Sequence, residues 1–391
     1  MTRKVQTPQS HNRMAPPSGP LPPARPLAPS ADMVLPYLRR LDARRIYSNC
    51  GPLSLLLEAR IAAMAGLDPS GAVATSSGTA GLVAALKARA PSPGLCLMPA
   101  WTFAATPAAA VMAGLTPYFL DVDPESWALD PAQVVEQAKT LAPAAILAVI
   151  PFGSPFDAEA WAMVERHSGA PVVIDAAAAF DALTSDAGPV GAVPTIVSLH
   201  ATKAVGCGEG GVVLSRDRDL AARVRRLTNF GFGEERLAVE QGFNGKMSEY
   251  HAAVGLAALD AWPERRGEWC AVKQRLRAGL AGLDGLALGP DARTDVAVST
   301  FNVLTDQTAE ALKLRLAAEG VMTLRWWSVG CADHPAFESC PRGPLPITRH
   351  LADHVLGLPL FPDMGADEAA RVIGAVSKTL AGDGVTAARR A

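Results

Sequence analysis

The stretch "HATKAVGCGEGGVVLS", residues 200–215, combines a lysine with a run of glycines. Gly206, Gly208 and Gly211 have the spacing GxGxxG, which in dinucleotide-binding proteins follows a strand and opens a helix. Here the glycines lead into the apolar run "VVLS", and "RRLTNFG" occupies the zone where an acidic residue is needed. The pattern therefore argues against dinucleotide binding. It predicts a glycine-rich turn between two strands, just after Lys203.

A lysine in a loop is usually a solvated surface residue, so a role for Lys203 requires supporting groups nearby. Ligands of open α/β sheets gather at the carboxyl ends of the strands. After the apolar run "AVAT" (72–75) come Ser77, Gly78 and Thr79. Their hydroxyls and free backbone N–H groups at a helix start would form a phosphate site. Taken alone, the same residues would be an ordinary helix cap.

Further strand ends supply matching groups. Trp101 and Phe103 follow the run "LCLM" and offer a flat face to a planar ligand, or are core aromatics. Asp175 ends "PVVID", where a buried carboxylate is costly without a cationic partner. Ser198 lies in "TIVSLH", shortly before Lys203.

One ligand uses all of these groups, namely pyridoxal 5′-phosphate (PLP). A lysine forms the Schiff base with it, a carboxylate keeps its pyridine nitrogen protonated, and an aromatic ring stacks on it. The protonated ring nitrogen is what makes the cofactor an electron sink. The sequence therefore predicts a PLP site at the carboxyl edge of a sheet.

The elements that must position this site follow a regular rhythm. Helical segments lie between most of the predicted strands, for example from Thr79 to Arg89 and near 157–168. This alternation predicts an α/β fold with a mainly parallel sheet flanked by helices. Only a loop separates the last two strands, so that pair can be antiparallel. The seven predicted strands are 72–75, 95–98, 117–122, 145–150, 171–175, 195–200 and 211–215.

A chain of 391 residues suggests two domains. Residues 1–20 are rich in proline, and we expect a disordered tail there. Residues 21–250 would form the large PLP-binding domain. Residues 251–391 contain more helix, and "HVLGLPLFPDM" followed by "GADEAARVIGAVSKTLAG" predicts strand, turn and helix. We therefore expect a smaller C-terminal α+β domain.

The composition excludes several classes of function. A net charge of −2 gives no basic excess for nucleic acid or an anionic membrane. No apolar stretch is long enough to span a bilayer, and no signal peptide is visible. The six cysteines form no C-x-x-C pair and no cluster with zinc spacing. We expect reduced cysteines, no metal site and a cytoplasmic protein.

Beyond these patterns, the chain resembles the DegT/DnrJ/EryC1/StrS family of sugar aminotransferases, which are PLP enzymes of fold type I. The matching segments occur in family order across roughly residues 45–375. They are "YSNCGPL", "ATSSGTAGL", "PAWTFAAT", "PYFLDVDPESWALDP", "VVIDAAAAF", "SLHATKAVGCGEGGVVLS", "LTNFGF", "GFNGKMSEYHAAVGL" and "VLGLPLFPDM".

The resemblance implies a role for each matching residue. Lys203 would form the Schiff base and carry the proton between the donor and the cofactor. Asp175 would pair with the pyridine nitrogen, and Phe103 would stack on the ring. Asn244 would reach the phosphate of the neighbouring subunit's cofactor, so a homodimer with composite active sites is implied, and Lys246 would lie near the substrate's diphosphate. The residues implied to bind the cofactor phosphate are Gly78, Thr79 and Ser198.

The resemblance also implies a reaction. An amino donor, usually glutamate in this family, would leave its amino group on the cofactor. A nucleotide-linked keto-6-deoxy hexose would then accept that group. The product would enter a lipopolysaccharide, another surface glycan or a secondary metabolite such as an antibiotic sugar.

Two segments depart from the family pattern. The family usually has Gln or His three residues after the pyridine-binding Asp, whereas this chain has Ala178. The segment "TLRWWSVGCADHPAF" also differs from the family's usual His–Tyr type of sequence near the substrate mouth. Arg325, Trp326 and Trp327 are candidate substrate contacts there, although at least one of two adjacent tryptophans is expected in the core.

Other functions of the same cofactor site stay open. A lyase or aldolase of fold type I would need the same apparatus, but "GFNGKMSEYHAAVGL" is typical of the sugar group. A non-catalytic PLP-binding regulator is the second alternative, suggested only by Ala178. A family subgroup that dehydrates sugars has His in place of the Schiff-base lysine, and Lys203 argues against that activity.

Overall fold

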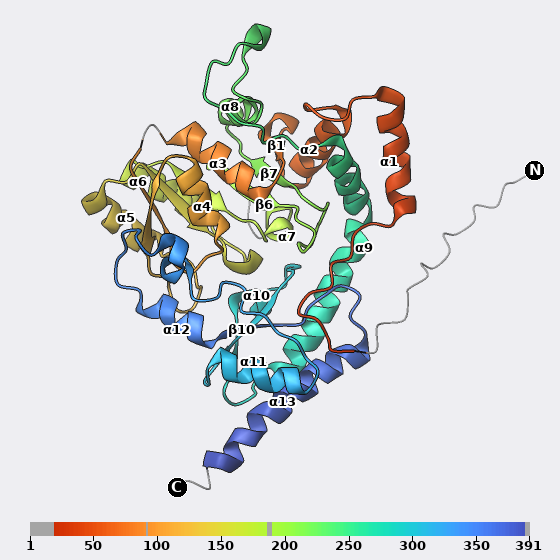
Figure 1. The fold of residues 1–391 in the computed structure, drawn as a ribbon, viewed down its shortest axis with the longest axis vertical. Coiled ribbons are helices and arrows are strands. Elements are labelled where there is room, and N and C mark those ends of the chain that lie inside the picture. Colours follow the sequence, from red (N-terminus) through yellow and green to blue (C-terminus); the bar gives the residue numbers. More distant parts are fainter. Residues whose placement is uncertain (1–18, 91–92, 186–189, 388–391) are drawn as a thin grey trace, which may run out of the picture.

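The computed structural model describes residues 19–90, 93–185 and 190–387, and the predicted tail at 1–20 lies almost wholly outside them. A seven-stranded sheet forms the centre of the larger domain, with the strand order β1-β7-β6-β5-β4-β2-β3 (Figure 1). All seven predicted strands are confirmed. Their bounds are β1 Ala72–Thr75, β2 Leu95–Pro99, β3 Thr116–Leu120, β4 Ala145–Val149, β5 Val172–Asp175, β6 Thr195–Ser198 and β7 Gly211–Leu214.

The direction of the strands brings the predicted site residues to one edge. The pairs from β3 through β2, β4 and β5 to β6 are parallel, whereas β7 is antiparallel to both β6 and β1. The predicted antiparallel pair is thus confirmed, with Ser198 opposite Gly211. Because only β7 runs in reverse, the carboxyl ends of β1, β5 and β6 lie at the same edge as the amino end of β7.

Both faces of the sheet are buried, which explains why its strands are continuous apolar runs. Alternate residues of β2 pack into different cores, Leu97 into one and Cys96 and Met98 into the other. One face is covered by α2 (Pro52–Met64), α5 (Pro131–Leu141), α6 (Ala158–Ser168) and α9 (Glu249–Leu280), and the other by α3 (Gly78–Arg89), α4 (Ala105–Met112) and α8 (Arg218–Thr228).

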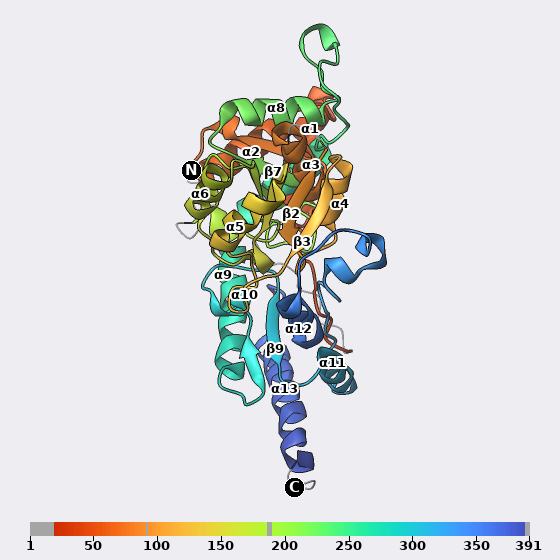
Figure 2. The same cartoon turned by 90° about the vertical axis from the view of Figure 1, so that its left-hand side faces the viewer.

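The smaller domain is built on a three-stranded antiparallel sheet with the order β10-β9-β8. Figure 2 shows it below the large sheet, with α13 extending away from both. The predicted strand, turn and helix near the C-terminus are confirmed. The elements are β8 Leu286–Leu288, α10 Pro290–Arg293, β9 Phe301–Thr305, α11 Ala309–Ala318, α12 Pro346–His354, β10 Val355–Leu358 and α13 Ala366–Ala387.

The first described residues of the chain pack on this smaller domain. Leu21 forms a parallel bridge with Val321, and its backbone N–H donates to Gly320 at 2.8 Å. Arg25 forms ion pairs with Asp363 at 3.1 Å and Glu368 at 2.9 Å. From there the chain leads through α1 (Ala31–Arg44) back to the large domain. The segment around Arg25 therefore spans both domains.

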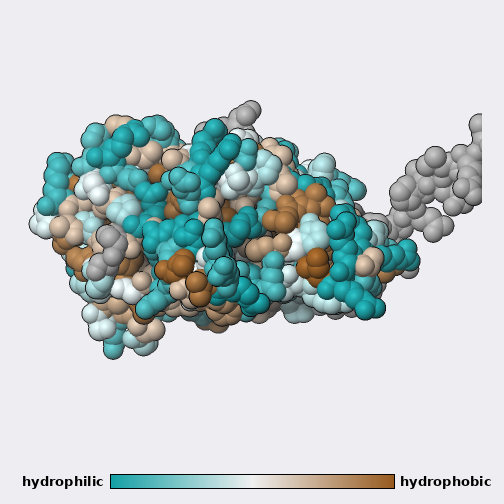
Figure 3. Space-filling model, turned by 90° about the horizontal axis from the view of Figure 1, so that it is seen from above, coloured by the Kyte–Doolittle hydropathy of each residue, from teal (hydrophilic) through white to brown (hydrophobic). Residues whose placement is uncertain are grey.

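The surface in Figure 3 is mostly hydrophilic, with apolar patches scattered over it. Within the described part of the chain, no helix is both long enough and apolar enough to cross a membrane.

A buried carboxylate joins the first turn of α9 to the first turn of α2. Glu249 is 1% exposed, and its two oxygens accept hydrogen bonds from the backbone N–H groups of Leu53 at 2.7 Å and Ser54 at 2.8 Å. These N–H groups have no partner within their own helix, because they belong to its first turn. The carboxylate also favours the positive end of the α2 dipole.

We therefore expect Glu249→Gln to lower the free energy of unfolding by about 2 kcal/mol, because one buried N–H group loses its acceptor. Urea unfolding at fixed protein concentration measures this. Glu310→Gln is the matched control, since among the described residues Glu310 forms only a solvent-exposed pair with Lys313 at 3.1 Å, worth about 0.5 kcal/mol. Equal losses in the two variants would contradict the proposed role of Glu249.

Candidate active site

A cavity of about 380 Å³ lies at the carboxyl edge of the large sheet. It brings together most of the predicted site residues: Gly78, Thr79, Phe103, Asp175, Ser198, Lys203 and Trp326. The other side of the cavity is closed by residues of the smaller domain and of the segment that leads into β9. They are Ser299, Thr300, Trp326 and Trp327, so the site lies between the two domains.

The start of α3 forms one end of the cavity, named here the phosphate end because the sequence predicts a phosphate site there. Ser77 caps this helix by accepting a hydrogen bond from the N–H of Ala80 at 3.1 Å. The remaining N–H groups of the first turn stay available to an anion. A Cβ on Gly78 would lie 3.2 Å from Cβ of Ser198, so glycine keeps the space between α3 and β6 open.

Gly211, the last glycine of the GxGxxG pattern, has a steric role. A Cβ at this position would lie 2.6 Å from the backbone N of Gly78 and 2.7 Å from the carbonyl carbon of Ser77. Glycine therefore lets the start of β7 touch the helix start that forms the phosphate end. The pattern is structural, as the sequence analysis predicted.

Asp175 is 6% exposed at the end of β5. Its carboxylate accepts hydrogen bonds from the hydroxyl of Thr106 at 2.8 Å and from the N–H of Ala177 at 3.2 Å. Burial raises the pKa of Asp175, and these hydrogen bonds together with the charge of Lys203 oppose the rise. Within the described residues Asp175 forms no ion pair, so Lys203 acts as the expected cation from a distance.

Lys203 projects from a turn that the backbone closes tightly. Its N–H donates to the carbonyl of His200 at 2.9 Å, and the N–H of Cys207 donates to Leu199 at 2.8 Å. Burial of the amino group lowers the pKa of Lys203, while the charge of Asp175 opposes this. A lowered pKa increases the fraction of neutral amine, which is the nucleophilic form.

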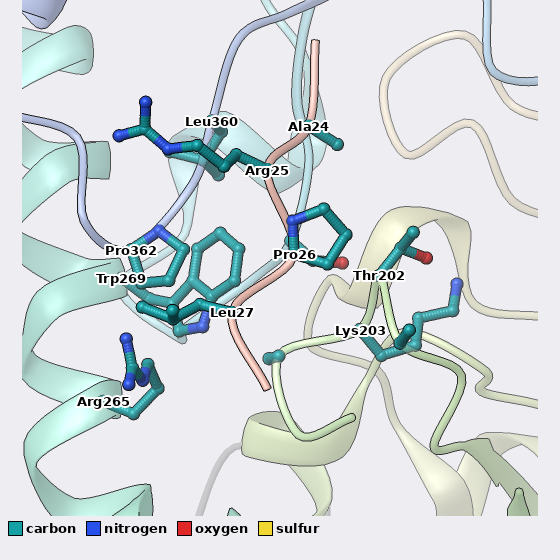
Figure 4. A pocket seen from close by; sticks show the side chains of 13 residues that line it. Ala24, Arg25, Pro26, Leu27, Thr202, Lys203, Arg265, Trp269, Leu360 and Pro362 are labelled. Atoms are coloured by element: carbon teal, nitrogen blue, oxygen red, sulfur yellow. The ribbon is translucent and has the colours of Figure 1, made fainter. Parts of the chain in front are cut away.

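Residues 24–27 pack against the lysine turn on the side opposite the cavity. Figure 4 shows Pro26 facing Thr202 and Lys203, Leu27 turned toward Trp269, and the amino group of Lys203 directed away from α9. The space between them is only about 10 Å³, too small for a substrate. Residues 24–27 thus pack against the outer side of the lysine turn.

Two predicted residues lie outside the cavity of their own chain. Lys246 donates from Nζ to Oδ1 of Asn244 at 2.8 Å, and this amino group also lies 4.6 Å from the ring centre of Phe230. Neither Asn244 nor Lys246 lines the cavity. This placement is compatible with their predicted action on a second subunit, which stays a prediction.

The far end of the cavity is aromatic. Trp327 stacks on Phe152 with ring centres 4.0 Å apart, and both line the cavity beside Trp326. Trp101 is core, 2% exposed, and packs edge-on against Trp327. Arg325 does not line the cavity, because its guanidinium donates to the carbonyls of Ser328 and Ala352.

Several residues that line the cavity were not predicted from the sequence. Phe152 follows β4 with a φ of 54°, a conformation that few non-glycine residues adopt, and it turns a buried ring into the cavity. The rule about strand ends applies to it too, and could have identified it. Ser299 and Thr300 line the cavity from the approach to β9, and the pairing of the two domains that brings them there has no local sequence signal.

Ala178 also lines the cavity. Gly153, with a φ of 86°, packs against it so closely that a Cβ would lie 2.3 Å from the carbonyl oxygen of Ala178. The polar side chain that the family pattern has here is thus replaced by an apolar wall next to Phe152.

The sheet, the lysine turn, the buried carboxylate and the phosphate end define the chain as an enzyme of the aminotransferase fold. It belongs to the DegT/DnrJ/EryC1/StrS aminotransferase family, whose model matches residues 32–377.

Named relatives support this assignment. The chain is 35% identical to dTDP-3-amino-3,4,6-trideoxy-alpha-D-glucose transaminase of Streptomyces venezuelae, over 86% of this chain and 89% of that protein. It is 31% identical to UDP-N-acetyl-3-dehydro-alpha-D-glucosamine 3-aminotransferase of Acidithiobacillus ferrooxidans, over 91% and 96%. The crystal structure of DesI with its TDP-sugar product superposes with a TM-score of 0.84 at 36% identity, covering 96% of each chain.

The space at Gly78 is open to a direct test. We expect Gly78→Ala to weaken PLP binding about tenfold, because the added methyl group crowds Ser198 and overpacking costs about 1–3 kcal/mol. Absorbance titration with PLP measures the affinity. Gly191→Ala is the control, because its Cβ would have no atom within 4 Å and should leave binding unchanged. Unchanged affinity in both variants would mean that the phosphate does not bind between α3 and Ser198.

Proposed function

We propose that this aminotransferase uses PLP to move an amino group from glutamate to the keto group of a nucleotide-linked 6-deoxy hexose. The observation that carries the proposal is the cavity itself. It joins Lys203, Asp175 and the start of α3 at one end to an aromatic surface at the other. A bound PLP would supply the electron sink for the transfer.

The residues present fit PLP. The N–H groups of α3 and the hydroxyl of Ser198 would hold a phosphate, and the exposed ring of Phe103 faces the cavity beside them. Asp175 would hold a proton on a ring nitrogen, because its own carboxylate is fixed by Thr106 and Ala177. Nζ of Lys203, with its lowered pKa, would carry a proton to and from the substrate carbon.

The aromatic end fits the less polar part of the acceptor. Phe152, Trp326 and Trp327 can pack on the C–H face of a deoxy sugar, as can the methyl-bearing wall at Ala178. The two named relatives act on a dTDP-linked and a UDP-linked sugar, and both of their names specify carbon 3. They support a nucleotide-linked sugar and leave the choice of nucleotide to experiment.

A homodimer with composite sites completes the proposal. Among the described residues that line the cavity, Lys203 is the only lysine or arginine. The carboxylates of glutamate and the diphosphate of the sugar need further cations. Lys246 of a second copy of the chain would supply one. Lys246 and Asn244 follow a projecting loop that exposes large apolar side chains, namely Phe230, Leu237 and Val239 (Figure 1). Such a loop is suited to burial against a second copy.

Two finer expectations remain predictions: action in the cytoplasm, and use of the product in lipopolysaccharide, another surface glycan or a secondary metabolite. The alternatives are a PLP-binding regulator and a lyase or aldolase. Glutamate would not change the cofactor bound to a regulator, and a lyase or aldolase would not keep the donor nitrogen in its product.

We expect glutamate to abolish the long-wavelength absorbance of the PLP-loaded protein, and a nucleotide-linked keto sugar to restore it. Testing dTDP- and UDP-linked keto sugars in the second step identifies the nucleotide. Lys203→Ala is the control and should show neither change at a comparable rate, because it lacks the proton carrier. A protein whose spectrum ignores glutamate would support the regulator, and a product that retains no donor nitrogen would support the lyase.

The composite site predicts complementation between two inactive variants. In a mixed dimer of Lys203→Ala and Asn244→Leu, one of the two sites has both native residues. Random re-pairing of equal amounts should therefore restore about a quarter of the wild-type activity, because half the dimers are mixed. No recovery after verified exchange of subunits would show that Asn244 acts within its own chain.

A further inference from the structure

The wall of the cavity that comes from the smaller domain is a short segment, Val296–Asn302. It places Ser299 and Thr300 in the cavity. Buried polar side chains from three other elements hold it: Lys273 of α9 donates to the carbonyl of Val296, and Asp181 accepts from the N–H of Ala297 at 2.6 Å. Asp291 of α10 is the third.

Asp291 is fully buried and binds this segment through a single oxygen. Oδ2 accepts hydrogen bonds from the hydroxyl of Thr300 at 2.9 Å, the backbone N–H of Asn302 at 3.1 Å and Nδ2 of Asn302 at 2.8 Å. Its other oxygen, Oδ1, is buried with no hydrogen-bond partner among the described residues, and the same is true of Oδ1 of Asn302. Two buried acceptors without a donor are costly.

A single proton on Asp291 would give both of these oxygens a hydrogen bond. A carboxylic acid and an amide can form a cyclic pair, in which the amide N–H donates to one carboxyl oxygen and the acid O–H donates to the amide oxygen. The first of these bonds is present between Nδ2 of Asn302 and Oδ2 of Asp291. The two oxygens left without partners are the two that the second bond would join.

We propose that Asp291 is a neutral carboxylic acid in the folded protein, donating from Oδ1 to Oδ1 of Asn302, and that this pair is a positioning device for Thr300 in the cavity wall. Thr300 gives its only proton to Asp291, so its hydroxyl presents only lone pairs to the cavity. The substrate group that it meets is therefore a hydrogen-bond donor, a sugar hydroxyl or an ammonium. This last step depends on the function proposed above.

The surroundings favour the neutral form. Burial raises the pKa of Asp291 to about 7, although hydrogen bonds from Thr300 and Asn302 oppose the rise. Two charged groups face it. The amino group of Lys273 donates to Val296; burial lowers the pKa of this amino group, and the charge of Asp291 opposes that. Asp181 pairs with Arg266 of α9 at 2.6 Å.

The remaining charges near Asp291 lie at the surface. Arg293, on the same short helix, donates to the carbonyl of Glu125 at 2.7 Å, and Asp295 pairs with Arg277 at 3.3 Å. In the described part of the chain Asp291 forms no ion pair.

Asp291→Asn tests the protonation state, because an amide has the shape and hydrogen-bonding pattern of the neutral acid but does not titrate. In the unfolded chain Asp291 ionises near its ordinary pKa of about 4. Between that value and about 7 the folded protein retains a proton that the unfolded chain has lost, so the stability of the wild type falls as pH rises. Relative to Asp291→Asn, the unfolding constant of the wild type should rise about tenfold per pH unit in this window.

Urea unfolding of the full chain across this range measures the difference, which should level off above about pH 7. The infrared band of a protonated carboxylic acid gives a second readout. It should be present in the wild type at pH 6, shift in D₂O and lose intensity in Asp291→Asn, where Asp175, whose pKa burial also raises, can still contribute. A pH-independent difference in stability together with equal band intensity in the two proteins would overturn the proposal.

The positioning role has its own readout. Asp291→Ala and Thr300→Val should each raise the KM of one substrate about tenfold, the effect of one lost hydrogen bond, with a smaller change in kcat. The conservative variants Asp291→Asn and Thr300→Ser should each keep the KM near the wild-type value. PLP absorbance should not change in any of the four, because neither Asp291 nor Thr300 is among the residues predicted to hold PLP. An unchanged KM in both disruptive variants would refute the positioning role.

The two failures are distinguishable. The pH window and the infrared band require no substrate and no PLP. If the chain transferred no amino group but showed both, the acid would stand and the proposed function would fail. If it transferred amino groups but showed neither, the reverse would hold.

Discussion

Burial of two opposite charges at one edge of the sheet is the constraint on which the site depends. Asp175 and Lys203 are each desolvated, which disfavours the charged form of both, and the charge of each stabilises the other. Such an arrangement is held only where a rigid backbone keeps both groups in place. The parallel run from β5 to β6 and the tight turn after β6 provide that backbone.

The same rigidity depends on close backbone contact and on buried carboxylates. Gly211 lets β7 touch the start of α3, and a Cβ there would separate the phosphate end from the lysine turn. Asp121 accepts from the N–H groups of Ile347 and Thr348 at 2.7 Å each, at the start of α12. Glu249 does the same for α2 within the larger domain. Carboxylates from distant parts of the chain thus close two helix ends, and that of Asp121 also joins the two domains.

Much of this architecture was predictable, because its signals are local. Each strand is a short apolar run, and Asp175, Ser198 and Lys203 lie at strand ends where the topology rule places ligands. The signals end where position depends on tertiary packing. Thr300 reaches the cavity only because Asp181 and Asp291 hold its segment, and the guanidinium of Arg325 is occupied by carbonyls that no local pattern reveals.

The departures from the family pattern have a common physical character. Ala178 and Phe152 make one side apolar, and Trp326 and Trp327 extend it. On the smaller domain, Thr300 adds an acceptor whose proton is already committed. A wall of this kind distinguishes ligands mainly by weakening the binding of the wrong ones. A ligand group that needs a hydrogen-bond donor from Thr300 would be buried without one, which costs binding free energy. We therefore propose that this wall, rather than the lysine turn, selects the acceptor.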